Sequence, residues 1–293
     1  MVKMGRQAAL KILFSKEVEL AVWEWEGAEP ALLFVHATGF HGRCWDQIIR
    51  MFPERRCLAV EARGHGRSSK PEPPYYWRAL GRDLVFVAEK LALRGTIGIG
   101  HSMGGHTIVQ AAAVRPDAFA ALLLVDPTIF PRAYYGGPPP DASFTLRRRS
   151  QWRSADEMYE RFHERMPFMR WRPQILRDYC DYGVLPDGEG FVLACPPRVE
   201  ASIYETCREP AADIYPEIAM VRQPVTVVRA KRTRDPGVFD LSLSPTSPEL
   251  ASCFANGREV VVEEGTHYIA MEEPELVVKE IRKLSGGSLR IAR

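Results

Sequence analysis

The sequence lacks several features that mark particular classes of protein. It has no run of about 18 consecutive apolar residues, so no helix that spans a membrane is expected. Lys and Arg number 39 against 37 Asp and Glu, and this formal net charge of +2 provides no basic excess for binding nucleic acid. No group of His, Cys and carboxylate residues has the spacing of metal ligands, so we expect neither a metal nor another cofactor.

The spacing of the cysteines gives no sign of a disulfide framework. They contain no C-x-x-C pair and are scattered along the chain, at Cys44, Cys57, Cys180, Cys195, Cys207 and Cys253. Such scatter in a long chain is typical of reduced thiols in the cytosol. The first residues are basic but carry no long apolar stretch that would indicate a signal peptide. We therefore expect a cytoplasmic protein, either a monomer or a homodimer.

The apolar residues that are present form a repeating pattern of strands and helices. Two alternating segments at the start, Ala9–Phe14 and Val18–Trp25, predict an antiparallel hairpin. Further short apolar runs predict strands at Ala31–His36, Cys57–Glu61, Thr96–Gly100, Ala120–Val125, Val225–Val228 and Glu259–Val262. Helical patterns lie between or after them, at Cys44–Met51, Trp77–Leu93, Met103–Val114 and Pro274–Leu284. This alternation predicts an α/β fold with a mostly parallel eight-stranded sheet and helices on both faces.

The stretch of residues 131–216 interrupts this pattern. It contains a Tyr-Tyr-Gly-Gly-Pro-Pro-Pro loop near its start and continues with many Arg, Trp, Phe, Tyr and Met residues in amphipathic helical patterns. We interpret residues 131–216 as a helical cap, inserted into a core domain made of residues 1–130 and 217–293. Its arginines would either select an anionic substrate or only solvate the cap. Its aromatic residues would either line a pocket or pack in the core of the cap.

One segment carries a catalytic motif. The apolar run that ends at Gly100 leads directly into Gly100-His101-Ser102-Met103-Gly104 and then into a helical pattern. G-x-S-x-G between a strand and a helix is the nucleophile elbow, a tight turn that lifts the serine hydroxyl clear of the sheet. The serine also lies at the positive end of the dipole of the following helix. We therefore predict that Ser102 is a nucleophile.

With this motif the chain resembles the α/β-hydrolase family over nearly its whole length. The stretch EARGHGRS at residues 61–68 is similar to the turn that follows the fourth strand in that family, with Glu in place of Asp. The resemblance implies that His267, in a loop between a strand and the last helix, is the general base. An imidazole in that role accepts the serine proton and makes the hydroxyl nucleophilic.

The loop sequence FVHATGFHGRCW is similar to the His-Gly loop after the third strand of the family, except that Ala37 replaces the usual Gly. In the family, this loop and the residue after the nucleophile donate two backbone N–H groups to the acyl oxygen. The resemblance therefore implies an oxyanion hole made by Thr38 and Met103. Trp45 also matches the family, either as a packing residue or as part of the binding site.

The carboxylate that orients the histidine has two main candidates. Most members of the family carry it after the seventh strand, where this chain has Thr233 and the nearest carboxylate, Asp235, comes two residues later. Some members carry it after the sixth strand, where this chain has Asp126. We predict Asp126, because the loop after the seventh strand departs from the pattern of the family, and keep Asp235 as the alternative. Asp240 and Glu264 are more distant choices.

A serine at the nucleophile position disfavours haloalkane dehalogenases and epoxide hydrolases, which use a carboxylate there. We predict instead a carboxylesterase-like serine hydrolase that cleaves an ester, lactone, thioester or C–C acyl bond of a small, partly apolar substrate through an acyl-enzyme. The candidate substrate-binding residues are His36, Trp45, His101, Trp152 and Phe168. Two alternatives remain open: a non-catalytic ligand receptor on the same fold, and a cofactor-free perhydrolase.

Overall fold

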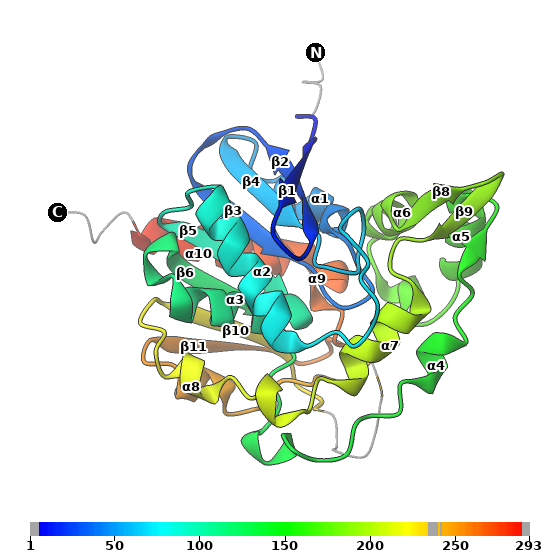
Figure 1. The fold of residues 1–293 in the computed structure, drawn as a ribbon. Helices are drawn as coiled ribbons and strands as arrows, with labels where there is room; N and C mark the ends of the chain where they lie inside the picture. Colours follow the sequence, from blue (N-terminus) through cyan, green and yellow to red (C-terminus); the bar gives the residue numbers. More distant parts are fainter. Residues whose placement is uncertain (1–5, 234–239, 241, 289–293) are drawn as a thin grey trace.

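The computed structural model describes residues 6–233, 240 and 242–288. At its centre is an eight-stranded sheet in the order β1-β2-β4-β3-β5-β6-β10-β11 (Figure 1). The strands are β1 (Ala9–Phe14), β2 (Glu19–Trp25), β3 (Ala28–Val35), β4 (Arg55–Val60), β5 (Thr96–His101), β6 (Phe119–Val125), β10 (Val225–Ala230) and β11 (Gly257–Val262). Strand β2 pairs antiparallel with β1 and β4, and all further pairs are parallel. The prediction of a mostly parallel eight-stranded sheet is confirmed.

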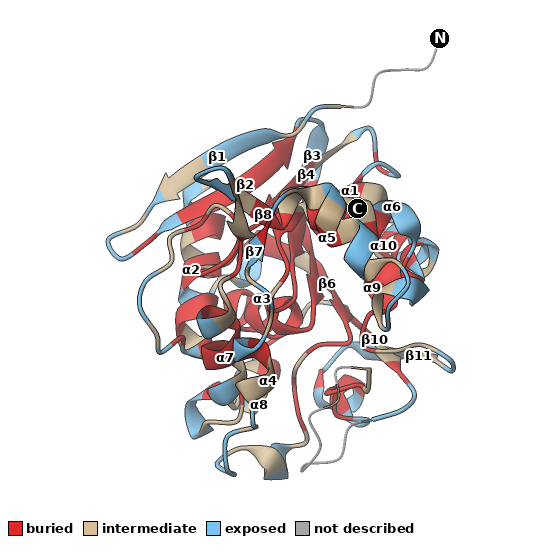
Figure 2. Cartoon of the chain, turned by 90° about the vertical axis from the view of Figure 1, so that its right-hand side faces the viewer, coloured by how far each residue is buried: buried red, intermediate tan, exposed pale blue. Residues whose placement is uncertain are grey.

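Both faces of this sheet are covered, which explains why its inner strands are continuous apolar runs rather than alternating ones. In β3, Leu32 and Phe34 belong to one core cluster, whereas Leu33 and Val35 belong to the cluster on the opposite face. Successive side chains of a strand point to opposite sides, and all four of these are buried. The edge strand β1 differs, since its residues are exposed or half-buried (Figure 2).

Helices cover the two faces of the sheet. On the face that carries Leu33 lie α2 (Trp77–Lys90), α3 (Met103–Val114) and α8 (Tyr215–Ile218). On the face that carries Phe34 lie α1 (Asp46–Ile49) and α10 (Pro274–Ser288). The short α9 (Ile269–Glu272) precedes α10. Short 3₁₀ helices occur at Gly42–Trp45, Pro116–Ala118, Arg132–Tyr134, Phe168–Arg170, Pro210–Ala212 and Leu250–Cys253. The helix predicted at Cys44–Met51 is thus a 3₁₀ turn followed by one short α-helix. None of the described helices is long and apolar enough to cross a membrane.

The inserted segment gathers on one side of the central sheet (Figure 1). Its α-helices are α4 (Ser143–Leu146), α5 (Ala155–Phe162), α6 (Pro173–Tyr182) and α7 (Pro197–Glu205). It also contains a small antiparallel sheet of β7 (Gln151–Trp152), β9 (Gly190–Leu193) and β8 (Val184–Asp187). The prediction of a purely helical insertion is corrected here. These strands are two to four residues long, too short for an alternating pattern to stand out in the sequence.

Candidate active site

The segment from β5 to α3 forms the sharp turn that the G-x-S-x-G motif predicts. Ser102 lies between the two elements with φ +56° and ψ −117°, a conformation that residues other than glycine rarely adopt. The flanking glycines make the turn possible. A Cβ at Gly100 would lie 2.5 Å from the backbone of Gly104, and a Cβ at Gly104 would lie 2.1 Å from the carbonyl oxygen of Val35. The turn places Ser102 at the N-terminus of α3, where it lines a cavity.

Ser102, His267 and Asp126 form a continuous chain of hydrogen bonds. Ser102 Oγ is 2.9 Å from His267 Nε2, and His267 Nδ1 is 2.7 Å from Asp126 Oδ2. The three residues follow the carboxyl ends of β5, β11 and β6, respectively, and therefore meet at one edge of the sheet. All three are buried. The structure thus brings together the predicted nucleophile, the predicted base and the favoured acid.

The second carboxylate oxygen of Asp126 fixes the orientation of this side chain. Asp126 Oδ1 accepts hydrogen bonds from the backbone N–H of Ala230 at 2.9 Å and from Ser244 Oγ at 2.7 Å. The other oxygen, Oδ2, accepts from the Nδ1–H of His267. Because a neutral imidazole carries only one ring proton, Nε2 has none and accepts from the Ser102 hydroxyl. The imidazole is thereby held in the tautomer that a general base requires.

The loop after β10 contributes a hydroxyl to this arrangement. Thr233, at the position where most of the family carries the acid, forms a parallel bridge with Ser244, whose side chain reaches Asp126. The alternative acid Asp235 lies outside the described residues. Asp240, a more distant choice, accepts hydrogen bonds from the backbone N–H and the hydroxyl of Ser242.

One residue that the sequence reasoning missed contacts the nucleophile. Thr128 Oγ1 is 2.9 Å from Ser102 Oγ, and the Thr128 N–H donates to the Ser102 carbonyl oxygen at 3.0 Å. Since the Ser102 hydroxyl donates to His267, its oxygen accepts from the Thr128 hydroxyl. The available sequence signal was the position of this threonine two residues after Asp126, in the Asp-Pro-Thr stretch that follows β6.

The two predicted oxyanion-hole residues lie close to the nucleophile in the fold. Thr38 follows β3 and lines the same cavity as Ser102, and Met103 is the first residue of α3. Within the described part of the chain, neither backbone N–H donates to a backbone acceptor. The loop next to Thr38 is fixed by Gly39, which has φ +80° and donates its N–H to His65 Nε2 at 3.0 Å.

Three of the five candidate substrate-binding residues are absent from the lining of the cavity. His36 Nε2 accepts from the Ala62 N–H at 3.0 Å, and burial lowers the pKa of His36 to about 4. Trp45 has no exposed surface and packs in the core beneath the sheet. His101 Nε2 donates to the His267 carbonyl oxygen at 2.7 Å, and burial lowers the pKa of His101 to about 3. We correct the role of these three residues from substrate binding to support of the loops and the core around the site.

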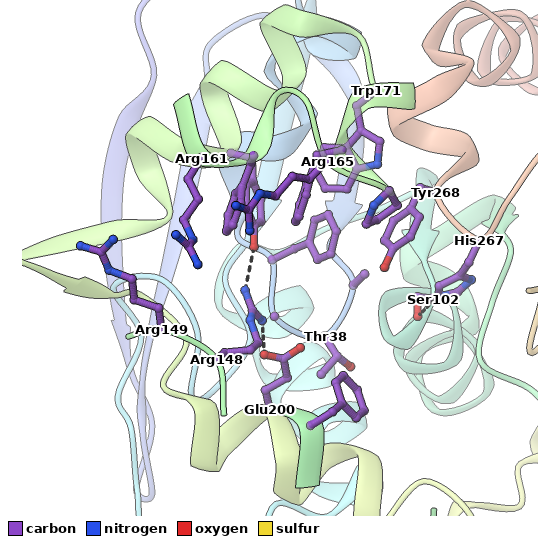
Figure 3. A pocket seen from close by; sticks show the side chains of 18 of the residues that line it. Thr38, Ser102, Arg148, Arg149, Arg161, Arg165, Trp171, Glu200, His267 and Tyr268 are labelled. Atoms are coloured by element: carbon purple, nitrogen blue, oxygen red, sulfur yellow. Dashed lines mark hydrogen bonds and ion pairs between the residues drawn. The ribbon is translucent and has the colours of Figure 1, made fainter. Parts of the chain in front are cut away.

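The other two candidates, Trp152 and Phe168, line a cavity of about 340 Å³ that reaches Ser102 and His267 (Figure 3). Aromatic side chains of the insertion form its apolar wall: Phe144, Trp152, Phe162, Phe168, Trp171, Tyr179 and Tyr204. Phe162 and Phe168 also stack, with ring centroids 4.3 Å apart, so these residues both pack against each other and line the cavity. A cavity of this size accommodates a small molecule.

Charged side chains line the same cavity. They are Arg148, Arg149, Arg161, Arg165 and Glu200, with the arginines at the end away from Ser102 and His267 (Figure 3). Arg148 donates to Tyr179 Oη at 3.2 Å and forms an ion pair with Glu200. Burial raises the pKa of Glu200, and the Arg148 guanidinium opposes this shift. In the part of the chain that the structure describes, no group of three or more His, Cys, Asp or Glu residues is placed to hold a metal ion.

This fold is the one that α/β hydrolases share, and comparison with known proteins agrees. The model of the alpha/beta hydrolase family matches residues 32–280, so the chain belongs to that family. The chain is 27% identical over 265 residues to the 2-(acetamidomethylene)succinate hydrolase of Mesorhizobium japonicum, a match that covers 87% of this chain and 88% of that protein. It is 34% identical over 110 residues to an esterase of Mycobacterium tuberculosis, a match that covers 37% of each chain. These relatives support an enzyme of the α/β-hydrolase type.

Solved structures are similar over nearly the whole chain. A crystal structure of E-2-(acetamidomethylene)succinate hydrolase has a TM-score of 0.75 at 21% identity and covers 96% of this chain and 100% of its own. The enol-lactonase of Burkholderia xenovorans has a TM-score of 0.68 at 19% identity and covers 94% of this chain and 100% of its own. At these identities the likeness establishes the fold.

Proposed function

We propose that this protein is a serine hydrolase that cleaves a carboxylic ester, or a related lactone, thioester or C–C acyl bond, through an acyl-enzyme. The observation that carries the proposal is the chain of hydrogen bonds from Ser102 through His267 to Asp126 at a small-molecule cavity. A protein that only binds a ligand does not need this chain of hydrogen bonds, so the receptor alternative has less support. A perhydrolase would use the same residues, and no described feature favours it.

In this mechanism, His267 Nε2 takes the proton of the Ser102 hydroxyl as Oγ attacks the carbonyl carbon of the substrate. Asp126 holds the imidazole in place and stabilises the imidazolium that forms. The imidazolium then protonates the leaving group, and the acyl group stays on Ser102. A water molecule, deprotonated by His267, attacks this acyl-enzyme and releases the acid.

The developing negative charge on the acyl oxygen would be stabilised by the backbone N–H groups of Thr38 and Met103. The elbow conformation of Ser102 places the Met103 N–H at the start of α3, where the helix dipole also favours an anion. Loss of one donor of such a hole typically costs about 100- to 1000-fold in kcat. The Thr128 hydroxyl would hold Ser102 Oγ in the position from which it attacks.

The inserted segment, residues 131–216, serves in this proposal as the cap that selects the substrate. Its support is the set of cap side chains in the cavity lining, which includes Trp152 and Phe168. The names of related proteins, an esterase, an enol-lactonase and a hydrolase of a succinate derivative, are consistent with acyl chemistry on small molecules without favouring one type of bond.

Hydrolysis of p-nitrophenyl acetate and butyrate by the purified protein tests the proposal. We expect turnover in the wild type and in a control variant, Ser252→Ala, which changes an exposed serine. Ser102→Ala and His267→Ala should each lower kcat by about 10⁴-fold or more, because these residues act as one unit. Activity that persists at the wild-type rate in Ser102→Ala would overturn the proposal. So would a folded wild type that cleaves no ester, lactone, thioester or C–C acyl bond of a small-molecule panel.

A further inference from the structure

The arginines of the inserted segment fall into two groups. Most of those outside the cavity lining form ion pairs: Arg170 with Glu272, Arg172 with Glu275, Arg177 with Asp181 and Arg198 with Glu72. Arg161 and Arg165 line the cavity and form no ion pair with any residue that the structure describes. Outside the lining, Arg147 also forms no ion pair with a described residue and donates instead to Ser143 Oγ, but most cap arginines there are paired.

The other two arginines of the lining already have partners within the protein. Arg149 pairs with Glu157 at 2.9 Å, and Arg148 pairs with Glu200. The carboxylate of Glu200 also lies against Gly39, beside the proposed oxyanion loop, where a Cβ would be 3.1 Å away. These two ion pairs offset the charges of their arginines. The uncompensated positive charge that faces the cavity therefore comes from the two unpaired arginines.

The position of these arginines relative to the nucleophile gives the cavity two distinct ends. Figure 3 shows the arginine side chains at one end and Ser102 with His267 at the other. Arg161 lies in the last turn of α5, and Arg165 follows one turn later, so neighbouring backbone presents both. Both side chains line the cavity and remain exposed to solvent, so an anion bound there would meet two positive charges. The planar guanidinium group binds carboxylates through paired hydrogen bonds.

We propose that the substrate of this enzyme carries a carboxylate at the end remote from the bond that is cleaved, and that Arg161 and Arg165 bind this carboxylate. The inference rests on the proposed function, because it assigns the opposite end of the substrate to Ser102. The aromatic side chains that line the cavity, which include Phe162 and Phe168, fit an apolar spacer. An acyl compound with a terminal carboxylate complements all three parts of the cavity.

A matched pair of esters tests the inference. Monoethyl adipate and ethyl hexanoate share the length of the acyl chain and the leaving group, and they differ in the terminal carboxylate. Ethanol release gives kcat/KM for both compounds. We expect the wild type to favour monoethyl adipate by about tenfold or more, since charge-assisted hydrogen bonds are the stronger ones. Equal values, or a preference for ethyl hexanoate, would overturn the inference.

Variants assign the preference to the two arginines. Arg161→Gln combined with Arg165→Gln should reduce the ratio of the two kcat/KM values to near one, whereas the corresponding pair of Lys substitutions should retain part of it. Arg147→Gln combined with Arg153→Gln removes the same charge from outside the cavity lining, and it should leave the ratio unchanged. A full preference for monoethyl adipate in the Arg161→Gln, Arg165→Gln variant would contradict the assignment.

Inhibition of the wild type tests the same site without any variant. Adipate should inhibit hydrolysis of p-nitrophenyl butyrate more strongly than hexanamide, which carries no carboxylate, by about tenfold. Labelling of Ser102 with a fluorophosphonate separates the two proposals. If Ser102 is labelled and esters are cleaved with no advantage for a terminal carboxylate, the inference fails and the proposed function stands. If Ser102 of the folded protein is not labelled, the proposed function itself fails.

Discussion

Ser244 Oγ donates to Asp126 Oδ1 at 2.7 Å, so the loop after β10 supports a carboxylate that comes from the end of β6. Ala230, the last residue of β10, donates a second hydrogen bond to the same oxygen at 2.9 Å. Most members of the family carry the carboxylate that orients the histidine in this loop. Here the Ser244 hydroxyl and the Ala230 N–H hold the side chain of Asp126. The geometry therefore favours Asp126 as the group that orients His267.

Replacing Asp126 by Asn should lower kcat for p-nitrophenyl butyrate by about 10⁴-fold, because an amide in this position stabilises the wrong tautomer of His267. Asp235→Asn is the matched control and should leave kcat near the wild-type value, since the Nδ1–H of His267 already has a carboxylate partner. If Asp235→Asn produced the large loss and Asp126→Asn the small one, the assignment of the acid would be reversed.

Thr128→Val should lower kcat/KM by about 2- to 12-fold, the equivalent of 0.5–1.5 kcal/mol for one hydrogen bond. The reason is that Ser102 Oγ loses the donor 2.9 Å away and is held by His267 alone. Thr128→Ser keeps the hydroxyl and should restore most of the rate. Steady-state kinetics on p-nitrophenyl butyrate measures both variants, and wild-type kinetics in Thr128→Val would refute a positioning role.

Gly104→Ala should lower the free energy of unfolding by about 1–3 kcal/mol or more, because its Cβ would need to displace strand β3. That Cβ would lie 2.1 Å from the carbonyl oxygen of Val35, whereas a Cβ at Gly286 meets no atom within 4 Å. Gly286→Ala is therefore the control, and it should not destabilise the protein. Urea unfolding followed by circular dichroism compares the three proteins. Equal midpoints for both variants would contradict the packing of the elbow against β3.

Acid should destabilise the protein, because its buried imidazoles resist protonation in the folded state. His106 allows the contribution of one such imidazole to be tested. His106 Nε2 donates to the Ala212 carbonyl oxygen at 2.9 Å, and burial, with a smaller effect of Arg78, lowers its pKa from 6.5 to about 3. The unfolded chain therefore binds a proton in this range that the folded chain does not. The stability that neutral His106 provides is complete above pH 6.5 and is lost as the pH falls toward 3.

The free energy of unfolding, measured between pH 7.5 and 4.5, tests this linkage in the wild type and in His106→Gln. Below pH 6.5 the wild type should lose stability faster than the variant, by up to about 1.4 kcal/mol per pH unit, the value for one proton. The comparison cancels the contributions of all other groups. Parallel curves for the two proteins would show that His106 takes up its proton equally in both states.

Those parts of the fold and site that depend on local signals could be predicted from the sequence. The apolar run of β5, the two glycines and the helical pattern of α3 specify the elbow around Ser102, because each acts through its own backbone and nearest neighbours. The parallel strands are similarly clear, since burial on both faces makes them continuous apolar runs. His267 could be assigned through the resemblance to a known family.

Contacts between distant segments could not be predicted in this way. His36 and His101 lie next to the elbow and oxyanion motifs in sequence, but their side chains point into buried hydrogen bonds with Ala62 and with the loop of His267. The contact of Thr128 with Ser102 and the support that Ser244 gives to the acid likewise depend on how loops converge at the edge of the sheet. Such convergence is a property of the tertiary structure, and sequence patterns of a single segment do not contain it.

Fluorophosphonate labelling followed by peptide mass spectrometry tests the central claim, that Ser102 is a nucleophile activated by His267. With His267 Nε2 at 2.9 Å from Ser102 Oγ, the wild type should gain one phosphonyl group on Ser102. His267→Ala should react far more slowly, and Ser102→Ala should not react. A label on a different residue, or no label on the folded wild type, would contradict the account.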